Sequence, residues 1–433
     1  MRLSVLIPVF AALLPSQGPA QTSSPSGSLA LTHVTVIDAT GAPARKDMTV
    51  VIKGDRIAAL GPAGEVPVPE GARVVEATGK FLIPGLWDMH GHLSYAKEPA
   101  LALMVMNGVT GVRDLGGDLN VIDRWREEIA RGTRLGPHIV RAGPFVDGPK
   151  PGAGDRLTVT NAAEARQAVG TLKQRGVDCI KVHNALTRDA FFALADEARK
   201  QGVPLAVHLP SGLWEKQTGG LTIAEASDAG ARSLEHIETL FESALYRKEA
   251  PAKGFDEAFA EYMGDAGAPL FARMVRNDTW FVPTLVAYFR GFVLWSSDPA
   301  ALPKRMAVHL KHIELVRAMH RAGVQIMAGS DFSDWALLPG FDLHDELAFL
   351  VQAGFTPMEA IQAATIKPAT FLGKKDSLGT VETGKIADLV LIDADPIENI
   401  NHTRMINSVI LGGKLIPIAA LRESFRKPES IDR

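Results

Sequence analysis

Two histidines separated by a single glycine, His90 and His92, lie at the end of the apolar run FLIPGLWDMHGH. In a β-strand, side chains at positions i and i+2 point to the same side of the sheet. Both imidazoles could therefore bind one cation. An isolated motif of this kind is also compatible with two solvated surface histidines, so the rest of the chain must decide between the two interpretations.

Other apolar segments also end in side chains that could bind a metal ion. They are Lys181 in CIKVH, His208 in PLAVHL, His236 in SLEHI and Asp331 in QIMAGSD. Four neutral imidazoles and a carboxylate form a suitable donor set for Zn²⁺ or a similar divalent ion. Because these residues end successive predicted strands, the pattern predicts one metal centre rather than scattered histidines.

Lys181 differs from the other candidates because an ammonium group repels a metal ion. A lysine that is buried on a strand, with its pKa lowered by desolvation, can react with CO₂ to give a carbamate. This anion offers two oxygens and could bridge two metal ions. The alternative is an ordinary ion pair with a nearby carboxylate, and the histidines around Lys181 favour the carbamate.

Three further residues near strand ends are candidates for substrate contacts. His183 shares the face of Lys181 by the i, i+2 rule, so it could line the substrate site or bind a metal ion. Arg113 and Arg141 could bind a substrate carboxylate, or could form pairs that include Asp114.

Tyr288, His344 and Cys179 complete the set of residues that could do chemistry. Tyr288 follows the seventh predicted strand and could polarise a carbonyl or simply pack. His344 lies on a helical pattern and is expected to be structural. Cys179 is the only cysteine, so an intramolecular disulfide and a cysteine-based metal site are both excluded.

The middle of the chain alternates short apolar strands with amphipathic helical segments. The predicted strands cover residues 86–92, 110–115, 138–143, 179–183, 204–209, 233–237, 280–285 and 325–331. Apolar residues between them recur at three- and four-residue intervals, as in NAAEARQAVGTLKQRG. Eight such units predict an α/β fold, a (β/α)8 TIM barrel. An open doubly wound sheet is the alternative, but no Gly-rich nucleotide motif follows the first strand.

The two ends of the chain have alternating apolar and polar residues interrupted by glycine, which is typical of antiparallel strands. We expect both ends to build one small β-sandwich domain. The predicted boundaries are a signal peptide at 1–20, sandwich segments at 21–84 and 371–433, and the barrel at 85–370.

The first twenty residues have the layout of a signal peptide. Arg2 precedes an apolar stretch from Leu3 to Leu14, and Gly18 and Ala20 occupy the −3 and −1 positions of a cut before Gln21. A disordered or anchoring N-terminus is the alternative. We therefore expect export to the bacterial periplasm or beyond, with no membrane association after cleavage.

The composition is that of an ordinary globular protein of 433 residues, with 46% apolar and 22% charged residues and a net charge of −3. Lysine and arginine form no basic block, so no nucleic-acid partner is expected. The expected partner is a small molecule, and assembly into a homo-oligomer is left open.

These segments together resemble the amidohydrolase superfamily, and in particular its imidazolonepropionase-like branch. The resemblance rests on GKFLIPGLWDMHGHL, CIKVH, LAVHL, SLEHIE, MAGSD and GTVETGKIADLVLIDADP, and it spans about Leu29 to Ile418. It implies metal ligands at His90, His92, Lys181 (carboxylated), His208, His236 and Asp331. In two-metal members of the family the lysine bridges both ions, and single-metal enzymes often lack it. Lys181 therefore argues for two divalent ions, with Zn²⁺ as the first choice, whereas imidazolonepropionase itself uses one.

The resemblance implies metal-dependent hydrolysis of a C–N bond, and we expect a dipeptide or an N-acyl amino acid as substrate. Asp331 is expected to accept a proton from the attacking water and to pass it to the leaving nitrogen. The alternatives are hydrolysis of a cyclic amide or a lactone, an imidazolonepropionase-type reaction, and a non-catalytic exported metal-binding protein.

Overall fold

A computed structural model of the protein describes residues 27–149, 155–209, 221–245, 254–294, 298–333 and 337–426. The predicted signal peptide lies outside these ranges. None of the helices in this part of the chain is both long enough and apolar enough to cross a membrane.

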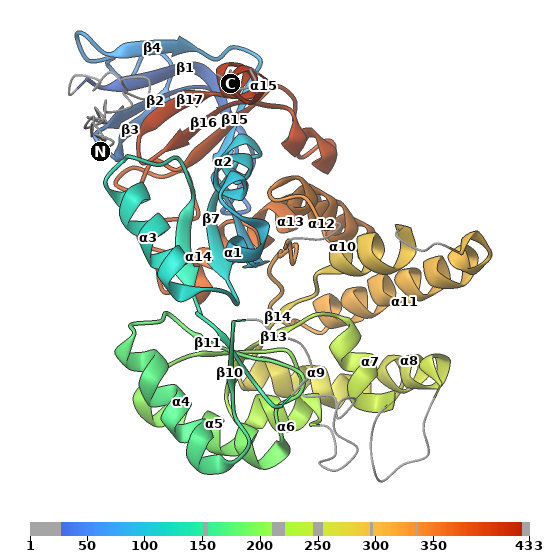
Figure 1. The fold of residues 1–433 in the computed structure, drawn as a ribbon. Helices are drawn as coiled ribbons and strands as arrows, with labels where there is room; N and C mark the ends of the chain where they lie inside the picture. Colours follow the sequence, from blue (N-terminus) through green and yellow to red (C-terminus); the bar gives the residue numbers. More distant parts are fainter. Residues whose placement is uncertain are drawn as a thin grey trace, which may run out of the picture.

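Strands from both chain ends form a separate sheet, which lies at the top of Figure 1. Its described strands are β1 (Leu29–Val36), β2 (Arg45–Lys53), β3 (Arg56–Pro62), β4 (Arg73–Glu76), β5 (Phe81–Pro84), β15 (Leu389–Ile392), β16 (Ile406–Leu411) and β17 (Lys414–Pro417). The order is β17-β16-β15-β5-β1-β2-β3, with β4 beside β1. β5 joins the two ends, because it pairs in parallel with β1 and antiparallel with β15. The predicted β-domain from both ends is confirmed at this level, as one hydrogen-bonded sheet with its own apolar core.

Shorter parallel strands make up the middle of the chain. Those described are β6 (Leu86–Gly91), β7 (Val109–Asp114), β8 (His138–Arg141), β9 (Phe145–Asp147), β10 (Arg156–Thr158), β11 (Ile180–Val182), β12 (Leu205–Val207), β13 (Ala231–Glu235) and β14 (Trp280–Val282). β6, β7 and β8 form one sheet, and β10-β9-β11-β12-β13-β14 form a second. The backbone N–H of Asp178, just before β11, donates to the carbonyl of Arg141 at 2.9 Å, which connects the two sheets.

The eighth predicted strand, residues 325–331, is not a regular strand in the structure. The segment still lies between β14 and β6. Met327 N donates to Phe281 O at 3.0 Å, and Asp331 N donates to His90 O at 2.8 Å. The segment is irregular because Asp331 has a left-handed backbone with a φ of 59° and because Ser330 N donates to a side chain, the carboxylate of Asp88.

Helices follow most of the parallel strands, as the amphipathic segments predict. The described helices are α1 (Leu93–Ala96), α2 (Pro99–Met106), α3 (Leu119–Ala130), α4 (Ala162–Gln174), α5 (Arg188–Gln201), α6 (Ile223–Asp228), α7 (Glu238–Leu245), α8 (Phe255–Met263), α9 (Gly267–Arg276), α10 (Leu285–Tyr288), α11 (Leu302–Arg321), α12 (Phe341–Gln352), α13 (Pro357–Ala363), α14 (Ile366–Phe371) and α15 (Ile418–Arg426). The side chain of Asn161 caps α4 by accepting from two backbone N–H groups, and Gly202 ends α5 in a left-handed conformation. Buried apolar residues of these helices and of the parallel strands form the main core.

Candidate metal centre

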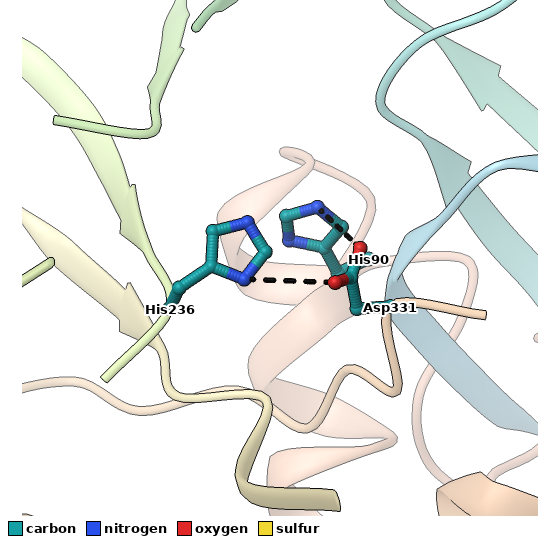
Figure 2. A group of neighbouring side chains, drawn as sticks. All are labelled: His90, His236 and Asp331. Atoms are coloured by element: carbon teal, nitrogen blue, oxygen red, sulfur yellow. Dashed lines mark ion pairs between the residues drawn. The ribbon is translucent and has the colours of Figure 1, made fainter. Parts of the chain in front are cut away.

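Three imidazoles converge on the carboxylate of Asp331, and Figure 2 shows two of them, those of His90 and His236. His90 is on β6, His92 directly follows it, and His236 directly follows β13. His90 Nε2 and His92 Nε2 lie 3.4 and 3.1 Å from Asp331 Oδ1. His236 Nδ1 lies 3.8 Å from Asp331 Oδ2. The two histidines of the first strand thus face one group, as the i, i+2 spacing predicts.

The hydrogen bonds of His90 and His92 determine which ring nitrogen carries the proton. His90 Nδ1 lies 2.9 Å from Glu235 Oε2, and His92 Nδ1 lies 3.2 Å from the carbonyl oxygen of Gly116. Both partners can only accept, so each Nδ1 donates and each Nε2 presents a lone pair. These lone pairs point at a carboxylate oxygen of Asp331, which is also an acceptor. Acceptors that meet in this way require a cation or a proton between them.

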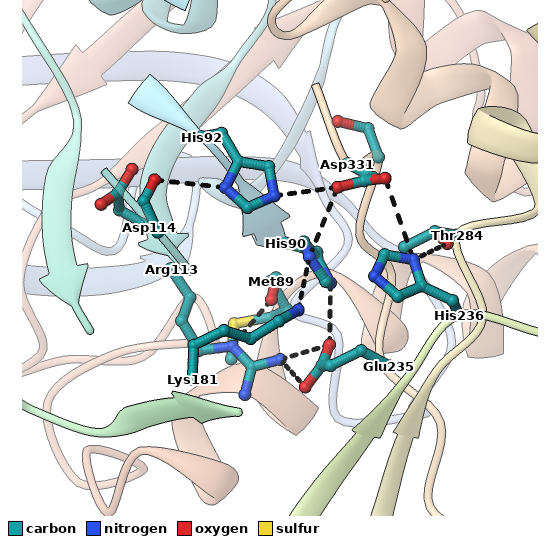
Figure 3. A network of polar contacts seen from close by, with 12 residues as sticks. Met89, His90, His92, Arg113, Asp114, Lys181, Glu235, His236, Thr284 and Asp331 are labelled. Carbon is teal, nitrogen blue, oxygen red and sulfur yellow. Dashed lines mark hydrogen bonds and ion pairs between the residues drawn. The ribbon is translucent and has the colours of Figure 1, made fainter. Parts of the chain in front are cut away.

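Lys181 lies beside this group, as Figure 3 shows. Its Nζ is 3.1 Å from His90 Nε2, and the side chain is 1% exposed. Burial lowers the pKa of Lys181 to about 8, although the charges of Glu235 and Asp331 oppose this shift. About a tenth of the amine is therefore unprotonated at pH 7, and this is the form that can react with CO₂.

His208 follows β12 and lies next to the convergent group. Its ring centroid is 4.6 Å from that of His236 and 5.0 Å from that of His183. The structure therefore brings His90, His92, Lys181, His208, His236 and Asp331 into one neighbourhood.

A buried ion pair supports His90 from below (Figure 3). Arg113 donates to Glu235 Oε1 and Oε2 at 2.8 and 3.0 Å, and also to Ser233 Oγ and to the carbonyl of Met89. Arg113 is 1% exposed and Glu235 is fully buried. The guanidinium thus faces the carboxylate that orients His90 instead of an open substrate site.

Two further carboxylates are buried around the first strand. Asp88 accepts from His90 N at 3.1 Å and from Ser330 N and Oγ at 2.9 and 2.6 Å, which ties β6 to the segment that carries Asp331. Asp114 accepts from Leu93 N at 2.7 Å. Burial raises the pKa of each carboxyl to about 7.

His183 is held by a second carboxylate, Asp147 at the end of β9. His183 Nδ1 lies 2.9 Å from Asp147 Oδ2, which also accepts from Arg156 Nη1 at 2.7 Å. The pKa of Asp147 is lowered because bonds from His183, Ala185 N and Arg156 outweigh the opposing effect of burial. The ring of His183 packs against His208, so it belongs to the same face as the candidate ligands.

The remaining candidates, Arg141 and Tyr288, have other partners in the structure. Arg141 donates to Asp123 and to the carbonyls of Gly176 and Arg175, so it joins α3 to the end of α4. Tyr288 ends α10, and its ring is 4.4 Å from that of His312.

His344 and Cys179 occupy the positions expected of structural residues. His344 bonds to Thr403 Oγ1 and to the carbonyl of Asn107, at 2.9 and 3.0 Å. Cys179 is buried, and burial raises the pKa of its thiol to about 12.

The donor set fits a divalent metal ion. Ligand atoms of His90, His236 and Asp331 lie within 4.8 Å of one another. Burial, together with neighbouring cationic groups, lowers the pKa of both imidazoles well below the usual range, so they remain in the neutral form that binds metal. Imidazole nitrogens with a carboxylate oxygen are typical of zinc sites.

Glu235, Asp88 and Asp147 support this centre and were not predicted from the sequence. Glu235 has a local signal, because a glutamate precedes His236 at the end of an apolar strand in SLEHI. A buried charge in that position needs a partner, and ligand histidines usually donate to a carboxylate. Asp88 lies two residues before His90 and carries the same kind of signal. Asp147 has none, since β9 itself was not predicted.

Known proteins resemble this chain over most of its length. The model of the "Amidohydrolase family" matches residues 81–416. Imidazolonepropionase from Shouchella clausii (strain KSM-K16) is 25% identical over 396 residues, which is 85% of each chain. Imidazolonepropionase from Fusobacterium nucleatum is 33% identical over 118 residues, but that match spans 25% of this chain and 27% of the relative.

The fold has counterparts among solved structures. A Xaa-Pro dipeptidase with bound methionine in its active site superposes with a TM-score of 0.71 at 22% identity, covering 90% of this chain and 100% of the other. This likeness concerns the mixed α/β fold with a separate β-sheet. Because the family model covers well over half of the chain, including all six predicted ligands, the chain belongs to the amidohydrolase family and is a hydrolase that acts on C–N bonds, distantly related to imidazolonepropionase.

Proposed function

We propose that this protein is an exported hydrolase that cleaves the amide bond of a dipeptide or an N-acyl amino acid at a centre of two divalent ions. The convergence of ring nitrogens of His90, His92 and His236 on Asp331, with the amine of Lys181 at 3.1 Å from His90 Nε2, carries the proposal. The eight segments predicted as strands close into a (β/α)8 barrel around this centre, and the terminal sheet folds as a two-layer sandwich.

As a carbamate, Lys181 would be one of the groups that hold the two ions. Its unprotonated Nζ attacks the carbon of CO₂, one N–C bond forms, and one proton is released to solvent, which leaves a single negative charge over two oxygens. This charge would offset the cations of a site where Arg113 is already neutralised by Glu235. The other groups that would hold the ions are His90, His92, Asp331, His208 and His236.

Each side chain has a role that follows from its contacts. Bound divalent ions supply a water of lowered pKa and polarise the scissile carbonyl. Asp331 takes the proton of the attacking water and returns it to the leaving nitrogen, because its carboxylate lies at the point where the imidazoles meet. Glu235 and the carbonyl of Gly116 keep the two Nε2 lone pairs pointing at that point.

Dipeptides and N-acyl amino acids are favoured because a dipeptidase shares this fold. Cyclic amides or lactones at the same site are the nearest alternative. The single-metal imidazolonepropionase reaction is the next, because the curated relatives carry that name. A non-catalytic metal-binding protein would show no turnover with any of these substrates.

Two measurements test the proposal. Elemental analysis of active enzyme should give about two divalent ions per chain, and His236→Ala should lower this number, whereas His33→Ala on the surface should not. The metal-loaded enzyme should hydrolyse members of a dipeptide and N-acyl amino acid library in preference to cyclic amides, lactones and imidazolonepropionate. One ion per chain at full activity would assign the protein to the single-metal type, and a clear preference for cyclic substrates would reject the proposed substrate class.

A further inference from the structure

A second group of histidines lies outside the metal centre, on α11. His309 and His312 are one turn apart and each is 1% exposed. Three of their ring nitrogens have no hydrogen-bond partner among the described residues. These are both nitrogens of His309 and Nδ1 of His312. A neutral imidazole always carries one N–H donor, so His309 buries a donor without an acceptor. Such groups are rare because they are costly, and each one calls for an explanation.

Aromatic rings surround these two histidines. The ring of His312 lies 4.4 Å from Tyr288, edge to face, and 5.0 Å from Phe241, measured between centroids. The ring of His309 lies 4.7 Å from Phe349 and is parallel to Tyr288 at 6.3 Å. The cluster therefore combines apolar faces with polar ring nitrogens that lack partners.

The cluster lies between the two segments that leave the metal centre at β13 and β14. α7, which carries Phe241, begins two residues after His236. α10, which ends at Tyr288, begins directly after Thr284, and Thr284 Oγ1 lies 3.0 Å from His236 Nδ1. Figure 1 shows α7, α8, α10 and α11 on the same side of the molecule, beside β13 and β14.

The rings of the cluster are themselves uncharged at neutral pH. Burial lowers the pKa of His309 to about 4 and that of His312 to about 3, so both rings are neutral at pH 7. Burial, with the charge of Glu238, raises the pKa of Tyr288 to about 12, so its hydroxyl is also neutral. Neutral imidazoles can donate and accept, and the phenyl rings offer apolar contact.

We propose that His309, His312, Tyr288 and Phe241 form a subsite for an uncharged aromatic side chain that carries a hydrogen-bonding group, such as a phenol. The subsite would receive one side chain of the substrate while the amide lies at the metal centre, so this role rests on the proposed function. The hydrogen-bonding group of the ligand would then bond to the ring nitrogens of His309 and His312 that have no partner.

Binding of p-cresol to the metal-loaded protein, with toluene as reference, tests the subsite without any turnover. We expect p-cresol to bind at least tenfold more tightly than toluene. His312→Phe keeps the ring and removes the nitrogens, so it should bring p-cresol down to the level of toluene and should raise Tm, because a buried group without a partner is lost. His320→Phe, farther along α11 and stacked on Phe355, is the matched control and should leave p-cresol binding unchanged. His309→Phe serves as the second variant if His312→Phe does not fold.

Equal binding of p-cresol and toluene to the native protein would overturn the subsite, as would unchanged p-cresol binding in a folded His312→Phe variant. Kinetics separate this failure from failure of the proposed function. Hydrolysis of dipeptides with no preference for tyrosine over alanine would leave the function and reject the subsite. Tight p-cresol binding that depends on His312, in a protein that cleaves no dipeptide and no N-acyl amino acid, would retain the subsite and reject the function.

Discussion

Replacing Glu235 with glutamine should weaken the metal centre although Glu235 is not itself a ligand. The carboxylate accepts from Arg113 at 2.8 and 3.0 Å and faces His90 Nδ1 at 2.9 Å, and both partners are buried. Glutamine has one acceptor oxygen, and its NH₂ group must face one of these donors. The change also leaves the guanidinium without its countercharge. Removing one partner of a buried ion pair costs about 3–5 kcal/mol, and losing the carboxylate behind a ligand histidine weakens metal binding about 10–100-fold.

Thermal unfolding and metal competition against a chelator measure the two effects. At about 1.2 °C per kcal/mol for a chain of this length, the Tm of Glu235→Gln should fall by about 4–6 °C. The double variant Arg113→Met/Glu235→Gln should lose less stability than the two single variants together, because the unpaired charge is gone. Glu382→Gln, a half-exposed carboxylate beside Lys385, is the control and should change Tm by less than about 1 °C. A Tm and a metal affinity of Glu235→Gln that equal those of the native protein would refute the supporting role of this carboxylate.

Four other outcomes are expected. Asp331→Asn should lower kcat by roughly two to four orders of magnitude with a smaller change in KM, and kinetics with the bound metal counted will check this. Lys181→Arg keeps a cation but cannot form the carbamate, so activity and the second ion should both be lost; near-normal turnover would make Lys181 a structural cation. N-terminal sequencing of protein exported by a bacterial host should begin near Gln21, and an intact N-terminus in the cytoplasm would contradict export. His312 has a pKa of about 3 in the folded chain, against 6.5 ordinarily, so the unfolded chain binds the proton first as the pH falls. The free energy of unfolding should therefore decrease below about pH 6.5, and His312→Phe should lose less of it between pH 7 and 5 than the native protein.

The convergent group could be predicted because local patterns contain it. His90 and His92 share a strand face by period 2, and His236 and Asp331 follow apolar segments whose ends meet when the strands are parallel. None of these inferences requires knowledge of a distant contact. The same holds for helices such as α4 and α5, where capping residues and apolar spacing agree.

Partners that are far apart in the sequence could not be predicted in this way. The sequence allowed two partners for Arg113, a substrate carboxylate or a pair that includes Asp114. Its actual partner is Glu235, 122 positions away. Alternation along β7 says on which side a side chain lies but not which carboxylate of another strand lies opposite. The contacts of Arg141 with the end of α4 could not be predicted either, because they depend on how a helix packs on its strand.

The eighth segment shows a different limit, which concerns the backbone. His236, Thr284 and Asp331 have left-handed backbones, with φ values of 70°, 48° and 59°. Each such conformation costs roughly 1–2 kcal/mol for a residue other than glycine, and glycine would avoid the cost but would bring no ligand or hydroxyl. The side chain of His236 contacts those of Thr284 and Asp331, and the backbone around them is held by bonds such as that from Asp331 N to His90 O. Strain persists where surrounding contacts over-determine it. The geometry of the centre is therefore imposed jointly by three segments: the one after β13, the one after β14, and residues 325–331. Residue types alone do not reveal that a strand pattern such as QIMAGSD must end in a residue with a left-handed backbone.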